Sequence, residues 1–216
     1  MPSLLDRLVR RLFSGGSARQ QFPFIKPGPL VDGELELVSP HLNRVDDLIL
    51  SANHPGALVD EAEPVSREQT MKFLRACPAG HQPPEVRTGT VPAYHFWMSL
   101  RAVPGFHPPI PIAGGIGLRI GQTEDLEKYL GHIGYHVHAP ARGRRLASRA
   151  VKLLLPLARH HGLEDVWITC NPENNASRRT IEHAGGRYID TVPVPPGHSL
   201  HARGETHKCR FVLSTR

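Results

Sequence analysis

The sequence predicts one domain of the α/β class, α+β in type, in which a mixed central sheet is flanked by helices. Its patterns follow the order strand, two helices, three strands, helix, strand, helix, two strands, which differs from the strict alternation of a barrel. A chain of 216 residues can bury a full core in one domain. The stretch from Gly131 to Ala150 reads as a strand, a tight proline turn and the start of a helix. The other elements are expected to be organised around that stretch.

The first half of the chain supplies strands and a pair of helices. Residues 34–38 alternate apolar and polar side chains as a strand does, and residues 41–52 gather apolar side chains on one helical side. A second helix is expected after Ser66 and through Ala76, because Gln69 completes a capping box with Ser66. The remaining elements of this half are a loop over 78–92 and strands over 94–103 and 112–120.

The second half contains the most apolar strand. A helix over 144–160 includes Pro156, which predicts a kink or an early end, and Gly162 should stop it. Residues 165–170 are almost wholly apolar, which favours a central strand buried on both faces. The other elements are a polar connection over 121–130, a strand over 131–138, a short helix over 174–184 ended by Gly185 and Gly186, and closing strands over 187–192 and 207–214.

The composition is that of a globular protein. Hydrophobic residues make up 39% of the chain, and no apolar run approaches the roughly 20 residues that span a bilayer. The three cysteines, Cys77, Cys170 and Cys209, are odd in number and lack CxxC spacing, which argues against a disulfide framework or a zinc site. A reducing compartment, the cytoplasm, is therefore expected.

The net charge of +6 lies mostly in the first 30 residues, where five Lys and Arg stand against Asp6 and contribute +4. The rest of the chain carries +2, which predicts no nucleic-acid groove. Residues 4–13 place apolar side chains on one helical face and arginines opposite. Such a helix can lie on a membrane, dock a partner, act as an import presequence or pack on its own domain. We expect residues 1–30 to form a basic amphipathic extension and linker, with peripheral membrane or partner contact through 1–14, and residues 31–216 to form the domain.

The turn between the strand over 131–138 and the next helix predicts an anion site. A helix start leaves backbone N–H groups free, and the positive end of the helix dipole lies there. Arg142, Arg144 and Arg145 add side-chain charge to the same place. A phosphate-bearing ligand is the first hypothesis.

Two motifs follow one another in the second half of the chain. The first, a loop after a strand, consists of Val137, Pro140, Arg142, Gly143, Leu146 and Ala147. The second, in a helix that ends in Gly-Gly, consists of Asn174, Ala176, Ser177, Ile181, Glu182, Gly185 and Gly186. In this order the two motifs resemble the phosphate loop and the second signature of the GNAT superfamily of acetyl-coenzyme A-dependent N-acetyltransferases, most closely a branch of predicted acetyltransferases. The resemblance is strong over residues 110–192, and the first 30 residues take no part in it.

The resemblance implies a sheet whose parallel strands, here 131–138 and 165–170, splay open to admit acetyl-coenzyme A. The pantetheine would pair with the backbone of one strand, as an added strand does. Asn174 and Ser177 would face the far arm of the cofactor. The cofactor-binding residues implied are Tyr135, His136, Val137 and His138 on the strand, and Arg142, Gly143, Arg144, Arg145, Leu146 and Ala147 around the pyrophosphate.

One residue departs from the family pattern, because Arg145 stands where the loop's most characteristic glycine is expected. Glycine lets backbone approach a phosphate closely. Either Arg145 swings out and reinforces the anion site, or the loop is degraded and binding is lost. Since the N–H groups survive the substitution and arginine suits phosphate, retained binding is favoured.

In such enzymes an amine attacks the thioester directly, which requires a base, an oxyanion donor and an acid for the thiolate. The oxyanion donor would be a backbone N–H near Tyr135 or Val137. His132 is the first candidate for the base, and the alternative is a hydrogen-bonded structural histidine. Ile181 stands where the family's acid, a tyrosine, is usual, so the stand-ins for the acid are Tyr135 and Tyr188. No metal site is expected.

The sequence therefore predicts an N-acetyltransferase that uses acetyl-coenzyme A on a primary amine, either a small molecule or a protein N-terminus. The acidic residues before the strand over 131–138 could bind a cationic substrate or form a solvated loop; they are Glu124, Asp125 and Glu127. The missing tyrosine and Arg145 motivate an alternative, a non-catalytic acyl-coenzyme A-binding or regulatory domain. The sequence leaves the oligomeric state open.

Overall fold

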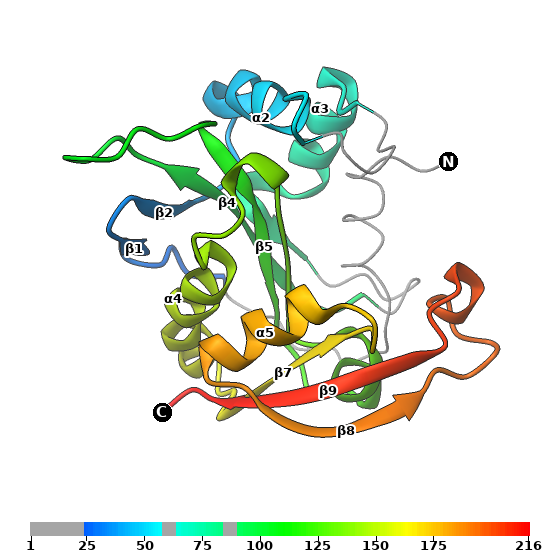
Figure 1. Cartoon of the computed structure of the whole chain (residues 1–216). Helices are drawn as coiled ribbons and strands as arrows, with labels where there is room; N and C mark the ends of the chain where they lie inside the picture. Colours follow the sequence, from blue (N-terminus) through cyan, green and yellow to red (C-terminus); the bar gives the residue numbers. More distant parts are fainter. Residues whose placement is uncertain (1–23, 58–63, 84–89) are drawn as a thin grey trace.

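The computed structural model describes residues 24–57, 64–83 and 90–216 (Figure 1). The amphipathic segment predicted over 4–13 lies outside these residues. Within them, no helix has the length and apolar character needed to cross a membrane.

The larger of two sheets is antiparallel throughout. Its strands lie in the order β1, β2, β4, β5, β6, and β3 pairs with β4 at the side. Neighbouring strands in this order are joined by hairpins or by the two helices that follow β2, so the predicted sequence of elements is confirmed. The strands are β1 (Val31–Asp32), β2 (Leu35–Val38), β3 (His81–Gln82), β4 (Ala93–Leu100), β5 (Ile112–Arg119) and β6 (Ile133–Val137).

The second sheet lies in the lower part of Figure 1 and has three antiparallel strands in the order β7, β9, β8. Their bounds are β7 (Asp165–Cys170), β8 (Arg187–Pro193) and β9 (His207–Ser214). The expectation that residues 165–170 are buried on both faces is wrong, because buried residues alternate with more exposed ones along β7. Trp167 belongs to the more exposed face, where the guanidinium of Arg210 covers its ring at 5.1 Å.

The helices cover both faces of the larger sheet. On one face, α2 (Val45–Ala52) places Val45 and Leu48 against Trp97 and Ile112 of β4 and β5. On the other face, α4 (Leu146–His160) packs into the main core with the alternate side chains of the same strands. The remaining helices are α3 (Arg67–Ala76), beside α2, and α5 (Asn175–Ala184), beside α4 (Figure 1).

Two sequence signals for helix ends are confirmed and one expectation fails. The capping box forms at α3. Ser66 Oγ accepts from the N–H of Gln69 over 3.1 Å, and Gln69 Oε1 accepts from the N–H of Ser66 over 2.8 Å. Helix α4 ends at Gly162, whose φ of +77° suits glycine. An early end at Pro156 does not occur, since α4 continues to His160.

The sequence patterns did not predict the two-residue strands β1 and β3, of which β3 lies in the predicted loop over 78–92, or several short helical turns. A π-helix, η3 (Leu126–Leu130), lies inside the predicted polar connection. The others are 3-10 turns: η1 (Leu42–Arg44), η2 (Pro78–Gly80), η4 (Ala139–Ala141) and η5 (His201–Arg203). Each is too short for a periodic pattern to reveal.

The segment before β1 packs against the domain. Phe24 stacks on the His81 ring with a centroid distance of 4.6 Å, and the N–H of Ile25 donates to the Tyr94 hydroxyl over 2.9 Å. Phe24, Ile25 and Leu30 also contact the main core. The described residues before β1 are therefore part of the packed domain.

Candidate active site

Strands β6 and β7 belong to different sheets and meet at the start of β6. The N–H of His132 donates to the carbonyl oxygen of Trp167 over 2.6 Å. A Cβ at Gly131 would lie within 3.2 Å of β7 backbone atoms, so a glycine allows the close approach. Beyond this junction, the described residues show no further backbone pairing between the two strands. The sheets therefore part along β6, as predicted for splayed strands.

His132 uses its side chain to hold this junction. Its Nδ1 accepts from the N–H of Trp167 over 2.9 Å, and its Nε2 lies 2.9 Å from the carbonyl oxygen of Gly121, to which it donates. The side chain is 2% exposed, and burial lowers its pKa to about 4. Because both ring nitrogens are engaged with backbone, the geometry favours the structural alternative for His132 over the role of base.

The hydrogen bonds of β6 decide which of its backbone groups face β7. The N–H of His138 donates to Ala113 of β5, and the carbonyl oxygen of His132 accepts from Arg119 of β5. Backbone groups alternate sides along an antiparallel strand. The N–H groups of Tyr135 and Val137 therefore point away from β5 and towards β7.

Tyr135 reaches from β6 to the first turn of α5. Its hydroxyl lies 3.0 Å from Ser177 Oγ and 3.2 Å from the carbonyl oxygen of Ser177. Burial raises the pKa of Tyr135 to about 12, so the phenol keeps its proton at neutral pH. Asn174 caps α5, because its Oδ1 accepts from the N–H of Ser177 over 2.9 Å. Tyr135 and Ser177 are thus brought together, while the Asn174 side chain is engaged in the cap.

The loop after β6 has the backbone of a glycine-rich turn. Gly143 and Arg145 have φ values of +84° and +54°, and Arg145 is the N-cap of α4. A left-handed conformation favours glycine, so Arg145 adopts a backbone conformation that glycine would adopt without strain. The N–H groups of Leu146, Ala147 and Ser148 open α4 and have no intrahelical partner.

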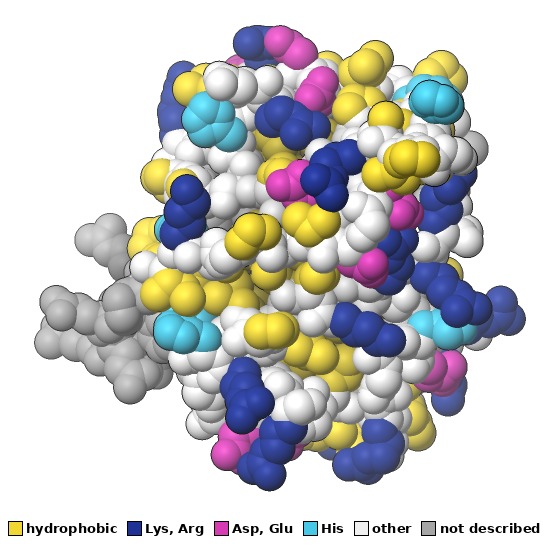
Figure 2. All heavy atoms as spheres, turned by 90° about the vertical axis from the view of Figure 1, so that its left-hand side faces the viewer, with side chains coloured by type: hydrophobic (Ala, Val, Ile, Leu, Met, Phe, Trp, Pro, Cys, Tyr) yellow, Lys and Arg dark blue, Asp and Glu magenta, His cyan; other side chains and the backbone are white. Residues whose placement is uncertain are grey.

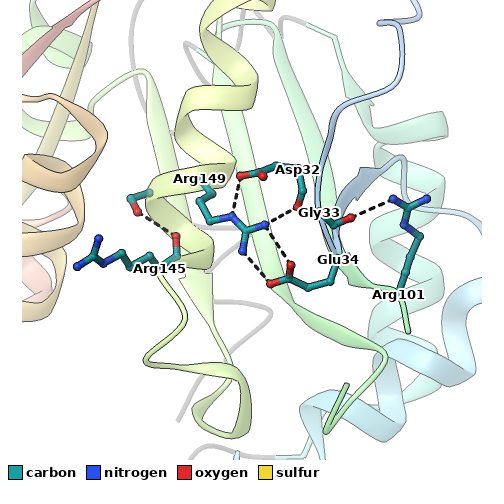
Figure 3. A network of polar contacts seen from close by, with 7 residues as sticks. Asp32, Gly33, Glu34, Arg101, Arg145 and Arg149 are labelled. Carbon is teal, nitrogen blue, oxygen red and sulfur yellow. Dashed lines mark hydrogen bonds and ion pairs between the residues drawn. The ribbon is translucent and has the colours of Figure 1, made fainter. Parts of the chain in front are cut away.

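The three loop arginines are exposed and spread around this turn. Arg142 donates from Nε to the carbonyl oxygen of Val137 over 2.9 Å. Arg144 lies over the Phe106 ring, 4.5 Å from its centroid. The Arg145 side chain points away from the neighbouring Arg149 cluster in Figure 3. Positive charge therefore surrounds the start of α4. None of these three arginines forms an ion pair with a described carboxylate, although Arg144 acts on Glu34 at longer range and contributes to lowering its pKa.

Arg149 ties the first turn of α4 to the hairpin of β1 and β2 (Figure 3). It donates to Asp32 Oδ2 over 2.6 Å and to Glu34 Oε1 over 2.8 Å, and it also contacts the carbonyl oxygen of Asp32. The side-chain hydrogen bond from Arg149 lowers the pKa of Glu34. From the other side of the hairpin, Arg101 donates to the carbonyl oxygen of Gly33 over 3.0 Å. The face around this cluster bears side chains of both charges (Figure 2).

His136 and His138 lie on the β6 face opposite Tyr135. Their rings meet edge to face, with centroids 5.1 Å apart. His138 is 4% exposed, and burial, with a smaller effect of Arg142, lowers its pKa to about 4. Its Nε2 has no hydrogen-bond partner among the described residues. A buried polar atom without a hydrogen-bond partner is uncommon in folded proteins.

Sequence patterns missed the polar contacts that fasten the loop between β8 and β9. His198 of that loop lies 2.8 Å from Asp125, which precedes η3. The ammonium of Lys208 donates to Asn171 Oδ1 over 2.6 Å and pairs with Glu205. His198 and Asp125, and Lys208 and Asn171, are far apart in the sequence, so no spacing could have indicated these two contacts. Asp125 is engaged with His198, and Glu124 pairs with Lys128 over 2.5 Å.

Other side chains near the gap between β6 and β7 fit structural rather than catalytic roles. Cys170, at the end of β7, is a buried free thiol whose pKa burial raises to about 11, which suits a small core side chain better than a nucleophile. Tyr188 bonds to Thr191 over 2.9 Å within β8. The described residues contain no group of three or more His, Cys, Asp or Glu that could hold a metal ion.

Comparison with known proteins gives one family. The family model for an acetyltransferase (GNAT) domain matches residues 37–187. No curated protein matches the sequence.

Solved structures share the fold at low sequence identity. A GCN5-related N-acetyltransferase from Brucella melitensis matches with a TM-score of 0.60 and 16% identity, over 89% of this chain and 81% of that one. The microcin C7 self-immunity acetyltransferase MccE, solved with acetyl-coenzyme A and AMP, matches with 0.59 and 17%, over 86% and 94%. RimL, a ribosomal L7/L12 alpha-N-protein acetyltransferase, matches with 0.57 and 16%, over 89% and 99%. These likenesses confirm the predicted fold class.

Proposed function

The chain belongs to the GNAT acetyltransferase family, and we propose that it transfers the acetyl group of acetyl-coenzyme A directly to a primary amine in a ternary complex. The proposal rests on one observation, the geometry of the β6 edge and of the helix start of α4 that follows it. The edge of β6 towards β7 is unpaired beyond His132 in the described residues, and it leads into a helix start with left-handed backbone at Gly143 and Arg145.

This unit fits acetyl-coenzyme A in two ways. The N–H groups that open α4, together with Arg142, Arg144 and Arg145, suit a pyrophosphate. The backbone of residues 135–138 offers groups on its free edge to an extended chain such as pantetheine. We assign the cofactor contacts of Leu146 and Ala147 to their backbone, because their N–H groups open α4 while their side chains are buried. Gly143 has no side chain and can contribute only its backbone.

Tyr135 suits the role of proton donor to the leaving thiolate. Its raised pKa keeps the hydroxyl protonated, and the side chain crosses the gap to Ser177 of α5. The family's usual tyrosine lies on the helix that corresponds to α5, so Tyr135 would serve from the opposite wall of the gap. The N–H of Tyr135 or Val137, directed towards β7, suits the developing oxyanion.

The acceptor is a primary amine, either a small molecule or a protein N-terminus. RimL is described as acting on a protein α-amino group, which supports testing peptides as well as small amines. Since all three cysteines are buried free thiols, we place the reaction in the cytoplasm. The second candidate, a non-catalytic acyl-coenzyme A-binding domain, is favoured by Ile181 in place of the usual tyrosine.

The test combines binding with turnover. Calorimetry should detect acetyl-coenzyme A binding to the wild-type chain and none to Gly143→Val, because a bulky residue cannot adopt the φ of +84° at low cost. Thiol release should then be measured with a panel of amines and short peptides, and Tyr135→Phe should lower kcat while the affinity for acetyl-coenzyme A stays unchanged. No binding at millimolar acetyl-coenzyme A would exclude both candidates. Binding without thiol release on any acceptor would favour the second.

A further inference from the structure

Two of the chain's three cysteines lie opposite each other on neighbouring strands. Cys170, the last residue of β7, pairs with Cys209 of β9 in a register without shifts. Side chains of directly opposite residues lie on the same face of a sheet. Both thiols are buried in the main core, with exposed fractions of 5% and 3%. Cys77, which ends α3, lies outside that core cluster. The sheet therefore brings two thiols together and leaves the third apart.

The backbone hydrogen bonds of β7 set the distance between the two residues. The N–H of Thr215 donates to the carbonyl oxygen of Glu164 over 2.9 Å, at the residue pair next to the ladder of β7 and β9. Both backbone groups of Trp167 bond towards β6 instead. Since bonded pairs recur at every second residue, Cys170 and Cys209 form a hydrogen-bonded pair, whose Cα atoms are about 5.5 Å apart. Disulfides join Cα atoms about 4.4 to 6.8 Å apart, so the strands are already spaced for one.

Each sulfur has a different partner in the reduced protein. Cys209 Sγ lies 3.3 Å from the hydroxyl of Thr191 on β8, which flanks β9 on the side away from β7. The Cys170 thiol hydrogen-bonds to Ser177, whose hydroxyl also lies 3.0 Å from that of Tyr135. Cys170 therefore belongs to the group of side chains that crosses the gap between β6 and β7. A bond between the two sulfurs requires each thiol to turn away from its hydroxyl, so the reduced and oxidised arrangements exclude each other.

The surroundings of Cys170 make its thiol slow to react. Burial, and then the neighbouring Cys209, raise its pKa to about 11, and Lys208 of β9 and Arg178 of α5 oppose this only in part. The thiolate is the form that attacks an oxidant, and little of it is present near neutral pH. Sustained exposure to an oxidant is therefore needed, and the pair stays reduced in an ordinary reducing compartment.

A disulfide at this position would also be easy to reduce. The Cβ atoms of directly opposite residues are about 4.5 to 5.5 Å apart. A disulfide draws them to about 3.5 to 4.5 Å, so the bond would strain strands β7 and β9. Strained disulfides are more easily reduced than unstrained ones and are typical of regulatory sites. The geometry thus favours a reversible bond over a permanent crosslink.

We propose that Cys170 and Cys209 form a reversible disulfide on exposure to peroxide, and that this bond slows acetyl transfer by drawing the Cys170 sulfur away from Ser177 and Tyr135. The effect on transfer rests on the proposed acetyltransferase function, whereas the bond itself does not. In that function Tyr135 supplies the proton that the leaving thiolate takes. The bond removes one of the two side chains that hold the Ser177 hydroxyl beside Tyr135.

The chemistry uses one molecule of hydrogen peroxide for each disulfide. The thiolate of one cysteine attacks a peroxide oxygen, the O–O bond breaks, and the hydroxide that leaves takes a proton to become water. The sulfur is now a sulfenic acid. The thiolate of the second cysteine attacks this sulfur, the S–S bond forms as the S–O bond breaks, and a second hydroxide leaves as water. The two sulfurs lose two electrons, and the peroxide gains them.

The experiment treats the full chain with hydrogen peroxide, removes the peroxide with catalase, and maps free and crosslinked cysteines by mass spectrometry after alkylation. Wild type should lose two of its three free thiols and yield a peptide pair joined through Cys170 and Cys209. Dithiothreitol should restore all three. Cys77→Ala should form the same bond, whereas Cys209→Ala should form none.

Acetyl transfer is measured on the same samples by mass spectrometry of the product, with ethanolamine and a short alanine-starting peptide as acceptors. Each protein is compared with its own reduced form. Oxidation should lower the kcat of wild type and of Cys77→Ala by about tenfold, part of what a general acid contributes, and dithiothreitol should restore it. Cys209→Ala should keep its rate through the same treatment.

Each outcome bears on a different step. The mapped bond with a reversible loss of transfer supports the proposal. Three free thiols after peroxide, or a bond that involves Cys77, overturns it, and so does a bond between Cys170 and Cys209 that leaves transfer unchanged. An equal loss of transfer in Cys209→Ala would assign the loss to other oxidation and overturn the effect. Reduced wild type that binds acetyl-coenzyme A but acetylates no acceptor overturns the proposed function and the effect on transfer, while the peptide map still decides whether the bond forms.

Discussion

The two ends of strand β6 differ in whether their buried histidines find hydrogen-bond partners. At its start, His132 is buried with both ring nitrogens bonded to backbone, and it joins the two sheets. At its end, His138 is equally buried, but its Nε2 has no described partner, and Arg145 follows in a left-handed conformation. Satisfied groups stabilise a fold, whereas unsatisfied groups and strained backbone persist where function requires them. From this contrast we expect a structural role at the start of β6 and a ligand-binding role near its end.

Replacing the two histidines in turn is the strongest test of this contrast. His132→Leu should lower the free energy of unfolding by about 3 to 5 kcal/mol, because the Trp167 N–H and the Gly121 carbonyl would be left buried without partners. His138→Leu should change it by less than about 1 kcal/mol, since no described hydrogen bond is lost. Urea unfolding of both variants measures the difference. Equal losses would remove the distinction between the two ends.

Acid should destabilise the protein through the same two side chains. Burial lowers the pKa of each from 6.5 to about 4, so the unfolded state binds protons that the folded state does not. Above pH 6.5 both side chains are neutral in the folded and the unfolded state, so the shift costs nothing; as the pH falls from 6.5 to 4, the folded state loses stability because only the unfolded state gains these protons. For each histidine the loss is about 3 kcal/mol.

The difference between wild type and His138→Leu isolates one of these contributions. The variant should show a shallower fall in the free energy of unfolding between pH 6.5 and pH 4, measured by urea titration at several pH values. Parallel curves for the two proteins would mean that the His138 ring is hydrated in the folded state.

Arg149, with its partners Asp32 and Glu34, holds the start of α4 rather than strand β6. Arg149→Met should raise the KM for acetyl-coenzyme A about tenfold, or about 1.4 kcal/mol, because the first turn of α4 loses its attachment to Asp32 and Glu34. The kcat should stay nearly constant, since no reacting group is touched. Arg101→Met is the control, because Arg101 binds the same hairpin at Gly33 without contacting α4. A matching rise in KM in both variants would assign the effect to the hairpin alone.

Sequence patterns predicted most of the fold because its elements carry local signals. The capping box at Ser66, the stop at Gly162 and the strand over 165–170 all depend on residues close together in the chain. Short turns such as η3 escaped because five residues hold too little periodicity.

The candidate site was only partly predictable, since its decisive contacts link distant residues. The motif residues predicted the loop between β6 and α4, but the bonds of His132 to Gly121 and Trp167 could not be inferred from spacing. The same holds for the bonds from Arg149 to Asp32 and Glu34, because Arg149 lies more than 100 residues from either partner in the chain.

The smallest expected effect tests the strained end of β6 directly. Arg145→Gly should raise the free energy of unfolding by about 1 kcal/mol, because glycine adopts a φ of +54° without the steric penalty of a side chain. Affinity for acetyl-coenzyme A, measured by calorimetry, should stay within about twofold if the backbone N–H groups carry the pyrophosphate. A tenfold loss, about 1.4 kcal/mol, would instead make the Arg145 guanidinium a direct phosphate ligand.

Gly143 provides the matched control in the opposite direction. A Cβ there would meet no atom within 4 Å, so Gly143→Ala alters only the backbone preference at a φ of +84°. It should lower the free energy of unfolding by about 1 kcal/mol, a change similar in size and opposite in sign to that of Arg145→Gly. If both variants shift stability as expected while only Gly143→Ala weakens acetyl-coenzyme A binding, the loop conformation, rather than the arginine charge, determines affinity. Arginine at position 145 would then be tolerated because its strain is small beside the binding energy of the backbone groups that it leaves in place.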